Sequence, residues 1–209
     1  MNIWFATNNS HKKEELEAIL NVTLKIPVEE GLKFDPDEIH SSFHENALLK
    51  ARELKKILGN DGACVIADDS GLCVDALDGR PGVYSARYGA TNAGGAANAS
   101  GTKLTSPQRN SLLLDELGDN PKRSARFVCA MVLLLDDSRF YIVQETVEGE
   151  IVKSAEFAKG DGGFGYDPIF LVSRFGKTMA ELSAEEKNSI SHRGKAGKLI
   201  GDILGRSGE

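Results

Sequence analysis

The sequence predicts an α/β or α+β domain with a long, twisted mixed sheet, and three local patterns support that fold class. A short apolar run at residues 2–6 leads through a polar cluster into apolar positions at helical spacing up to Leu20. Two apolar runs, at 126–135 and 139–147, flank an Asp-Asp-Ser turn as in a β-hairpin. Helical patterns close the chain. Of the two classes we expect α/β.

The other elements follow from their own local signals. Ser42 and Glu45 form a capping-box pattern at the start of a helix. Ser106-Pro107 reads as an N-cap followed by proline at the first helical position. An acidic turn at 68–71 separates two apolar runs, and residues 90–105 have the small polar composition of a mobile surface excursion. We expect further strands at 22–27, 63–67, 72–77 and 169–172, a tight loop at 79–82, and helices from Ser42 to about Leu58, from Ser106 to near Gly118, from Ser183, and from Ser191 to Leu204.

Length and charge exclude several classes of protein. The 209 residues fit one domain spanning 1–209 with a flexible insertion at about 90–105. A formal net charge of −6 lacks the electrostatic footprint of a nucleic-acid or anionic-membrane binder. The longest apolar run, Phe127 to Leu135, is far shorter than the ~20 residues of a membrane helix. We therefore expect no nucleic-acid partner and no membrane insertion.

Cysteine usage and the N-terminal residues predict a cytoplasmic protein. The three cysteines, Cys64, Cys73 and Cys129, lie in apolar stretches without a C-x-x-C pair, which is typical of buried reduced thiols. The first ten residues show no signal-peptide pattern.

A polar cluster between the first strand and the first helix is a candidate phosphate site. A helix N-terminus presents unpaired N–H groups and a partial positive charge, and a lysine adds a mobile full charge. Taken alone, an ordinary N-cap with a solvent-exposed lysine is the commoner explanation of such a cluster. The residues are Thr7, Asn8, Asn9, Ser10, His11 and Lys12.

The acidic segment Asp68-Asp69-Ser70-Gly71 is the candidate catalytic centre. One carboxylate can hold a hard cation such as Mg²⁺ while its neighbour orients water, whereas the structural alternative is an Asx-turn between strands. Glu38 and Glu45 are further candidate ligands, and Glu45 also has a structural explanation as the capping-box partner of Ser42. Lys50 either approaches phosphates or pairs with a nearby glutamate.

Two later segments carry groups suited to a flat, polar ligand. In the Gly-rich loop 162–168, Phe164 or Tyr166 offers a stacking face and Asp167 an acceptor, although an aromatic loop packed on the core is an equal alternative. Basic residues just before the final helix oppose the usual helix-dipole preference, which points to an anionic or carbonyl-bearing ligand or to a solvated surface. They are Lys187, His192 and Arg193.

Together these segments resemble the inosine triphosphate pyrophosphatase family. Each motif alone is weak, but all appear in the family's order. The matching stretches are Thr7-x-Asn9-x-x-Lys12, Phe43-x-Glu45-Asn46-Ala47-x-x-Lys50-Ala51, Asp68-Asp69-Ser70-Gly71-Leu72-x-Val74, Pro81 to Tyr88, Gly163-Phe164-Gly165-Tyr166-Asp167-Pro168-x-Phe170, Ala180-Glu181-Leu182 and Lys187-x-x-Ile190-Ser191-His192-Arg193-Gly194-x-Ala196.

The resemblance implies an α/β fold with a long central sheet and two lobes around a cleft, usually as a homodimer. It implies Mg²⁺-dependent cleavage of ITP, dITP and XTP to the monophosphate and pyrophosphate. By position, Asp69 is the general base and a metal ligand with Glu38, and Ser70 contacts substrate. Residues from Thr7 to Lys12 bind the triphosphate. The base is held by Phe164, Gly165, Tyr166, Asp167, Lys187, His192 and Arg193.

The chain departs from the family pattern in three places. Ile39-His40 replaces a Thr-Gly pair after the acidic residue, His11 replaces a glycine before Lys12, and residues 92–103 look like an insertion. Two other functions remain open on the sequence alone: a related pyrophosphatase acting on pyrimidine or methylated nucleotides, and a nucleotide-binding regulatory module without turnover.

Overall fold

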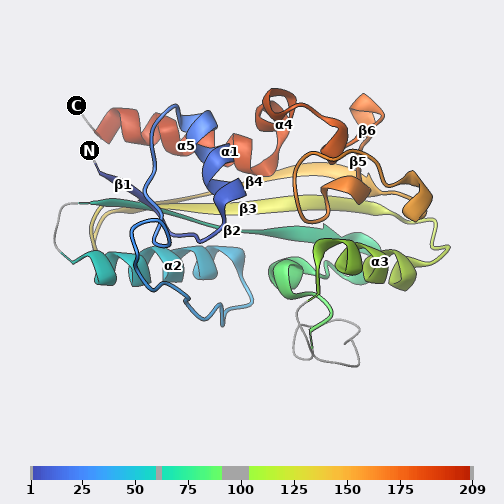
Figure 1. Ribbon diagram of the computed structural model, residues 1–209, viewed down its shortest axis with the longest axis horizontal. Helices are drawn as coiled ribbons and strands as arrows, with labels where there is room; N and C mark the ends of the chain where they lie inside the picture. Colours follow the sequence, from blue (N-terminus) through green and yellow to red (C-terminus); the bar gives the residue numbers. More distant parts are fainter. Residues whose placement is uncertain (1, 60–62, 91–103, 208–209) are drawn as a thin grey trace. The chain divides into compact units, whose positions relative to one another are not determined.

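The computed structural model describes residues 2–59, 63–90 and 104–207 (Figure 1). Six strands form one sheet in the order β1-β2-β3-β4-β5-β6. β1 pairs with β2 in parallel, whereas the β4–β5 and β5–β6 pairs are antiparallel, so the sheet is mixed as predicted. The strands are β1 Ile3–Phe5, β2 Cys64–Val74, β3 Ser124–Leu134, β4 Phe140–Ile151, β5 Phe170–Val172 and β6 Lys177–Thr178.

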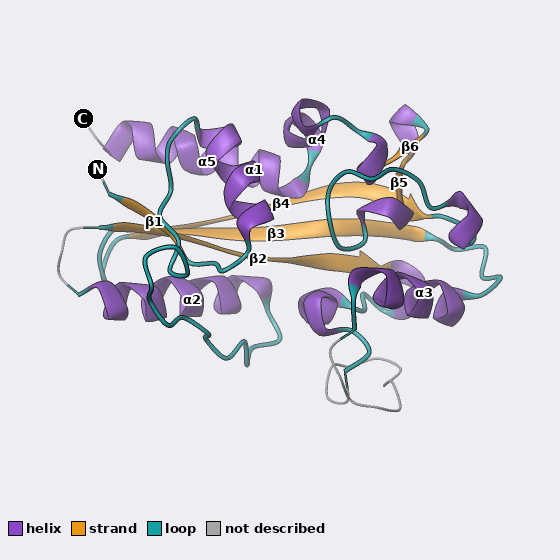
Figure 2. Cartoon of the chain, viewed as in Figure 1, coloured by secondary structure: helices purple, strands orange, loops and turns teal. Residues whose placement is uncertain are grey.

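Helices accompany the sheet, which confirms the α/β class (Figure 2). No helix in the described part of the chain is both long and apolar enough to cross a membrane. The α-helices are α1 Ser10–Leu20, α2 Phe43–Leu58, α3 Ser106–Leu117, α4 Ala184–Ile190 and α5 His192–Ser207.

The chain divides into two compact units, and the boundary in β2 falls between Asp69 and Ser70. The first unit contains Met1–Asp69, Cys129–Glu145 and Ser191–Glu209, and the second contains Ser70–Val128 and Thr146–Ile190. Each unit has apolar clusters of its own. That residues 1–209 act as one functional domain stays a prediction.

Alternation along β2 organises the core of the first unit. Val65 and Ala67 pack in a cluster with Ala47, Ala51 and Leu54 of α2. Cys64 and Ile66 point the other way, into a cluster with Leu16 of α1 and with Ala196 and Ile200 of α5. Figure 1 shows α2 on one side of these strands and α1 and α5 on the other. Because side chains of a strand alternate with period 2, each following β2 residue is assigned to one of these two faces.

The second unit is built around one apolar cluster. It includes Leu72 and Val74 of β2, Leu113 of α3, and the Phe127 and Phe170 rings, whose centroids lie 4.6 Å apart. Tyr166 is part of the same cluster. The loop that follows Gly160 is therefore anchored to the core of its own unit.

The structure corrects two predicted strand boundaries. Residues 68–71 are not a turn between two strands: β2 runs without interruption from Cys64 to Val74. Residues 22–27 form no full strand, because only Lys25 bridges to Trp4 of β1. The predicted hairpin of β3 and β4 is confirmed as adjacent strands joined by residues 135–139.

Two predicted helix caps are also corrected. Ser42 precedes α2, but its side chain makes no capping hydrogen bond, so the predicted capping box with Glu45 does not form. The N-cap of α3 is Thr105, which forms a capping box with Gln108, and Ser106 is already inside the helix. Most of the predicted excursion at 90–105 lies outside the described residues.

The packing of α2 yields a stability prediction. Leu54 is fully buried against β2, so Leu54→Ala should lower the free energy of unfolding by about 2–5 kcal/mol. Ile57 lies on the same helix but is exposed, and Ile57→Ala should change that free energy by less than about 0.5 kcal/mol. Urea denaturation of the two variants tests the assignment, and equal losses would contradict it.

Candidate active site

Strand alternation places the carboxylates of Asp68 and Asp69 on opposite faces of β2. Asp68 continues the series of Cys64 and Ile66 toward α1 and α5, whereas Asp69 continues the series of Val65 and Ala67 toward α2. Both side chains are buried, at 1% and 4% exposure. A buried carboxylate requires a charged or hydrogen-bonding partner. The residues on each face of β2 must therefore supply partners for the carboxylate on that face.

On its face, Asp68 is held by two cations. The Lys12 ammonium lies 2.9 Å from Asp68 Oδ1. Arg193 of α5 donates from Nη2 and Nε to Asp68 Oδ2, at 2.9 and 3.2 Å, and from Nη1 to Glu15 Oε2 at 2.7 Å. Burial alone would raise the pKa of Asp68, but Lys12, Arg193 and Lys50 hold it well below its ordinary value. Asp68 is therefore a permanently ionised anchor for Lys12.

The Arg193 guanidinium is buried at 1% exposure, and all three of its nitrogens donate to carboxylates. These hydrogen bonds join α5 to α1 and β2, and the expected contact of Arg193 with a ligand base stays a prediction. His192, the first residue of α5, is also buried.

The first motif forms the turn into α1. Asn9 is the N-cap, and its Oδ1 accepts from the Lys12 N–H at 3.3 Å, while Thr7 Oγ1 accepts from the Asn9 N–H at 3.1 Å. Asn8 Nδ2 donates to the Phe34 carbonyl at 2.5 Å. Ser10 begins the helix, and His11 is exposed in its first turn. The cap thus fixes the turn from which Lys12 reaches Asp68.

On the opposite face, Asp69 shares a cation with a second carboxylate. Lys50 Nζ lies 2.8 Å from Asp69 Oδ1 and 2.5 Å from Glu38 Oε1, and it donates to the Asp68 carbonyl at 3.1 Å. Asn46, one helical turn before Lys50, donates to Asp69 Oδ2 at 3.3 Å. Side chains of α2 therefore engage both oxygens of Asp69 and bring Glu38 beside it.

This environment gives Asp69 a proton affinity unlike that of Asp68. Burial raises the pKa of Asp69, and although Lys50 opposes the rise, Glu38 reinforces it, so the pKa lies above its ordinary value. Two adjacent residues of one strand consequently have pKa values moved in opposite directions. Such a separation is typical of sites in which one carboxylate anchors and its neighbour exchanges a proton.

The surroundings of Asp69 fit a hard divalent cation. Two carboxylates converge on one ammonium, so a positive charge is already accommodated between them, and carboxylate oxygens are the ligands that Mg²⁺ prefers. Glu45 is exposed and Asp68 lies on the face of β2 toward α1, whereas Glu38 lies beside Asp69. No group of three or more metal-ligating side chains occurs among the described residues.

In the second unit, Asp167 and Lys187 form a buried ion pair. Lys187 Nζ lies 2.8 Å from Asp167 Oδ2, which also accepts from the Phe164 N–H at 2.8 Å. The same ammonium lies 5.0 Å from the centroid of the Phe164 ring. The structure therefore brings the Phe164 ring, the Lys187 ammonium and the Asp167 carboxylate together, and their contact with a base stays a prediction.

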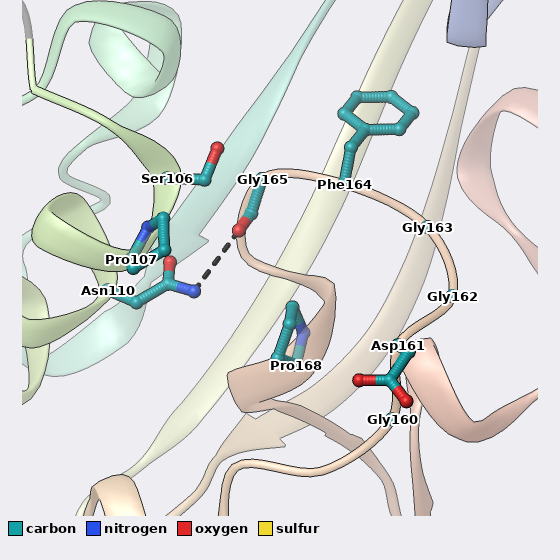
Figure 3. Close-up of a pocket in the computed structure, with 10 residues that line it drawn as sticks. All are labelled: Ser106, Pro107, Asn110, Gly160, Asp161, Gly162, Gly163, Phe164, Gly165 and Pro168. Atoms are coloured by element: carbon teal, nitrogen blue, oxygen red, sulfur yellow. Dashed lines mark hydrogen bonds between the residues drawn. The ribbon is translucent and has the colours of Figure 1, made fainter.

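A cavity of about 250 Å³ adjoins this loop, with the loop on one side and α3 on the other (Figure 3). Asn110 of α3 donates to the Gly165 carbonyl at 3.1 Å and so ties the two sides together. The cavity is lined by Ser106, Pro107, Asn110, Gly160 to Gly165 and Pro168.

Tyr166 differs from its neighbours in the loop. Its side chain is buried in the apolar cluster, and its hydroxyl donates to the Ser85 carbonyl at 3.0 Å. Burial raises the pKa of this hydroxyl above its ordinary value. Tyr166 therefore anchors the loop to the core of its unit, and its expected contact with a ligand stays a prediction. Ser70 follows Asp69 in β2 and is half-buried.

Two contact residues, Glu15 and Asn46, were missed by the sequence analysis. Glu15 follows Lys12 by three residues and therefore shares its helical face, which was an available signal. Asn46 belongs to the motif that begins at Phe43, and an asparagine inside an apolar helical pattern is the local indication that its amide has a partner.

The ion pair of Asp68 with Arg193 leads to a prediction about stability and its dependence on pH. Asp68→Asn leaves Arg193 without a full counter-charge and should lower the free energy of unfolding at pH 7 by about 3–5 kcal/mol. The folded pKa lies below the ordinary 3.8, so this contribution is complete above pH 3.8 and is lost as the pH falls toward the folded value. The difference between wild type and variant should therefore shrink below about pH 4, as measured by urea denaturation. A difference that is independent of pH would contradict this, and exposed Asp35→Asn is the control.

Comparison with known proteins places the chain among close relatives. A model of the Ham1 family matches residues 3–202. The chain is 50% identical over 197 residues to a dITP/XTP pyrophosphatase of Treponema denticola, with 94% of each chain covered. It is 43% identical to a dITP/XTP pyrophosphatase of an Exiguobacterium species, covering 98% of this chain and 97% of the relative. The solved structure of the Staphylococcus aureus Ham1 protein superposes with a TM-score of 0.81 at 38% identity, covering 99% of this chain and 100% of that one.

Proposed function

The chain belongs to the Ham1 family, and on that premise we propose that it hydrolyses the non-standard purine nucleoside triphosphates ITP, dITP and XTP to the monophosphate and pyrophosphate. The observation that carries the proposal is the buried Asp69 carboxylate, held beside Glu38 by Lys50. Removal of these nucleotides from the cellular pool is the role that such an activity serves.

Asp69 is the proposed general base. Its raised pKa increases its affinity for the proton of an attacking water, and burial keeps bulk solvent from competing for that proton. Glu38 and Asp69 would hold Mg²⁺. When bound, Mg²⁺ neutralises phosphate charge and lowers the pKa of coordinated water. Lys50 contributes a further positive charge to this face of β2.

Lys12 and the N-terminus of α1 are proposed to bind the phosphates, together with Thr7, Asn8, Asn9, Ser10 and His11. The Lys12 ammonium is held by Asp68 but its side chain keeps 16% exposure, so it can donate to an anion while its charge stays balanced. The backbone N–H groups of the helix start favour negative charge developing on pyrophosphate as it leaves.

In the second unit we assign recognition of the base to Phe164, Gly165, Asp167 and Lys187. Phe164 offers a ring for stacking. Lys187 has only N–H donors, so it complements the 6-keto oxygen of hypoxanthine or xanthine. Adenine carries an amino donor at that position, which would leave buried donors unpaired at a cost of about 1–3 kcal/mol each.

We also propose a cytoplasmic location and a homodimer. The three free cysteines support the first, since burial raises the pKa of Cys64 to about 11 and that of Cys129 to about 12, which keeps both thiols protonated and unreactive. The family resemblance supports the second, and light scattering coupled to size-exclusion chromatography tests it.

A nucleotide panel tests the function. Pyrophosphate release should be fast from ITP, dITP and XTP with Mg²⁺, far slower from GTP, ATP and dTTP, and absent in EDTA. Preference for a pyrimidine would overturn the proposed base recognition but not the hydrolysis. Tight binding of ITP without release of pyrophosphate from any nucleotide would make the protein a binding module.

Asp69→Asn should abolish measurable turnover of ITP, because loss of a general base alone costs about 10²–10⁴-fold. The side chain keeps its shape, so circular dichroism should be that of the wild type. Near-normal kcat would show that another group is the base. Exposed Asp37→Asn is the matched control and should keep full activity.

Phe164→Ala should raise KM for ITP roughly 5- to 150-fold, because stacking of a base on an aromatic ring contributes about 1–3 kcal/mol. Phe157 lies in the same unit but is exposed, so Phe157→Ala should leave KM unchanged. Steady-state kinetics of both variants separate the two roles. Equal KM values for the two variants would contradict the assignment of Phe164 to the base site.

A further inference from the structure

The side-chain amide of Asn46 is fully buried, and it makes three hydrogen bonds, two to the backbone of His40 and one to Asp69. Oδ1 accepts from the His40 N–H at 3.1 Å, and Nδ2 donates to the His40 carbonyl at 3.1 Å. Nδ2 also donates to Asp69 Oδ2 at 3.3 Å. One amide therefore holds both polar groups of a single loop residue and one oxygen of the proposed base.

The paired bonds to His40 match the chemistry of an amide. A carboxamide offers an acceptor and a donor side by side, which complements the N–H and C=O of one backbone residue. His40 lies only two residues after Glu38, in a segment without regular secondary structure. Since no helix or strand fixes this segment, Asn46 supplies the backbone partners that a ladder would otherwise provide.

Asn46 and Lys50 lie on one face of α2 and make different kinds of contact. They are four residues apart, so both side chains project from the same side of the helix. Lys50 contacts the carboxylates of Glu38 and Asp69 directly, as a charge. Asn46 is neutral and contacts the backbone beside Glu38, so its bonds can persist when another cation replaces the ammonium between the two acids.

We propose that Asn46 is a positioning residue: it clamps the loop at His40 so that Glu38 stays opposite Asp69 and both carboxylates present one preassembled cation site. The proposal rests on the proposed function, which assigns these carboxylates to catalysis. Misplacement of a reacting group by about 1 Å can cost 10²-fold in rate, so release of the loop should act on turnover more than on substrate binding.

Two variants of Asn46 and one control test the clamp. Asn46→Ala removes all three hydrogen bonds. Asn46→Asp keeps the shape of the side chain and one acceptor but loses both N–H donors. This variant replaces Asn46→Ala in the test if the alanine variant does not fold. Leu54→Ala destabilises the same helix without contacting His40, Glu38 or Asp69, so it controls for a general loss of stability.

Two readouts are combined, each at a temperature where circular dichroism shows all proteins folded. Hydrogen exchange followed by mass spectrometry should show faster exchange of the His40 amide in Asn46→Ala than in wild type or Leu54→Ala. With ITP and saturating Mg²⁺, kcat should fall about tenfold to 100-fold in both Asn46 variants, with KM within about twofold of wild type. Leu54→Ala should keep its kcat.

Unchanged exchange at His40 in Asn46→Ala would overturn the proposal, as would unchanged kcat in both Asn46 variants. An equal loss of kcat in Leu54→Ala would also overturn it, because stability alone would then explain the effect. A failure of the proposed function can be told apart from a failure of the positioning role of Asn46, since the wild type would then release no pyrophosphate from any nucleotide. In that event exchange at His40 still decides whether Asn46 clamps the loop.

Discussion

The first unit depends on the neutralisation of two adjacent carboxylates in the middle of β2. Asp68 and Asp69 lie in a continuous strand whose other residues are mostly apolar, and burying either charge without a partner would cost several kcal/mol. Alternation sends them to opposite faces, so the two carboxylates draw on separate partners. Three helices are tied to the strand in this way: α1 through Lys12, α5 through Arg193 and α2 through Lys50.

The two faces resolve their charges differently, and the difference suits different tasks. On the Asp68 face, Lys12 and Arg193 more than compensate the carboxylate, and Glu15 restores the balance, so Asp68 stays ionised and structural. On the Asp69 face one ammonium serves two carboxylates, which leaves an excess of negative charge. That excess is what a divalent cation would neutralise. Burial is the main cause that raises the pKa of Asp69, and the Glu38 carboxylate adds to the rise while Lys50 opposes it.

In the second unit, the Asp167 carboxylate fixes the position of its neighbours through two hydrogen bonds. A single carboxylate oxygen accepts from the Phe164 backbone and from Lys187, so the position of the ring depends on the ion pair. Gly163 has a positive φ of 71°, and a Cβ there would lie 2.1 Å from the same Asp167 oxygen, so the loop requires glycine at this point. Tyr166 anchors the loop to the core from the other direction, through Ser85. The loop is therefore held in place by contacts within its own unit.

Sequence patterns alone determined the α/β class, the positions of α1 and α2 and the β3–β4 hairpin, because periodicity and helix starts are local properties. The pattern of the acidic segment predicts a turn, whereas the structure has a strand there, since two adjacent aspartates in a buried strand are unfavourable unless cations from distant parts of the chain meet them. Only the tertiary structure supplied those cations, and only it showed that Arg193 and Tyr166 are buried and bonded within the protein while Asn46 faces Asp69. The role of a polar side chain depends on which partners reach it, and those partners lie up to 178 residues away along the chain.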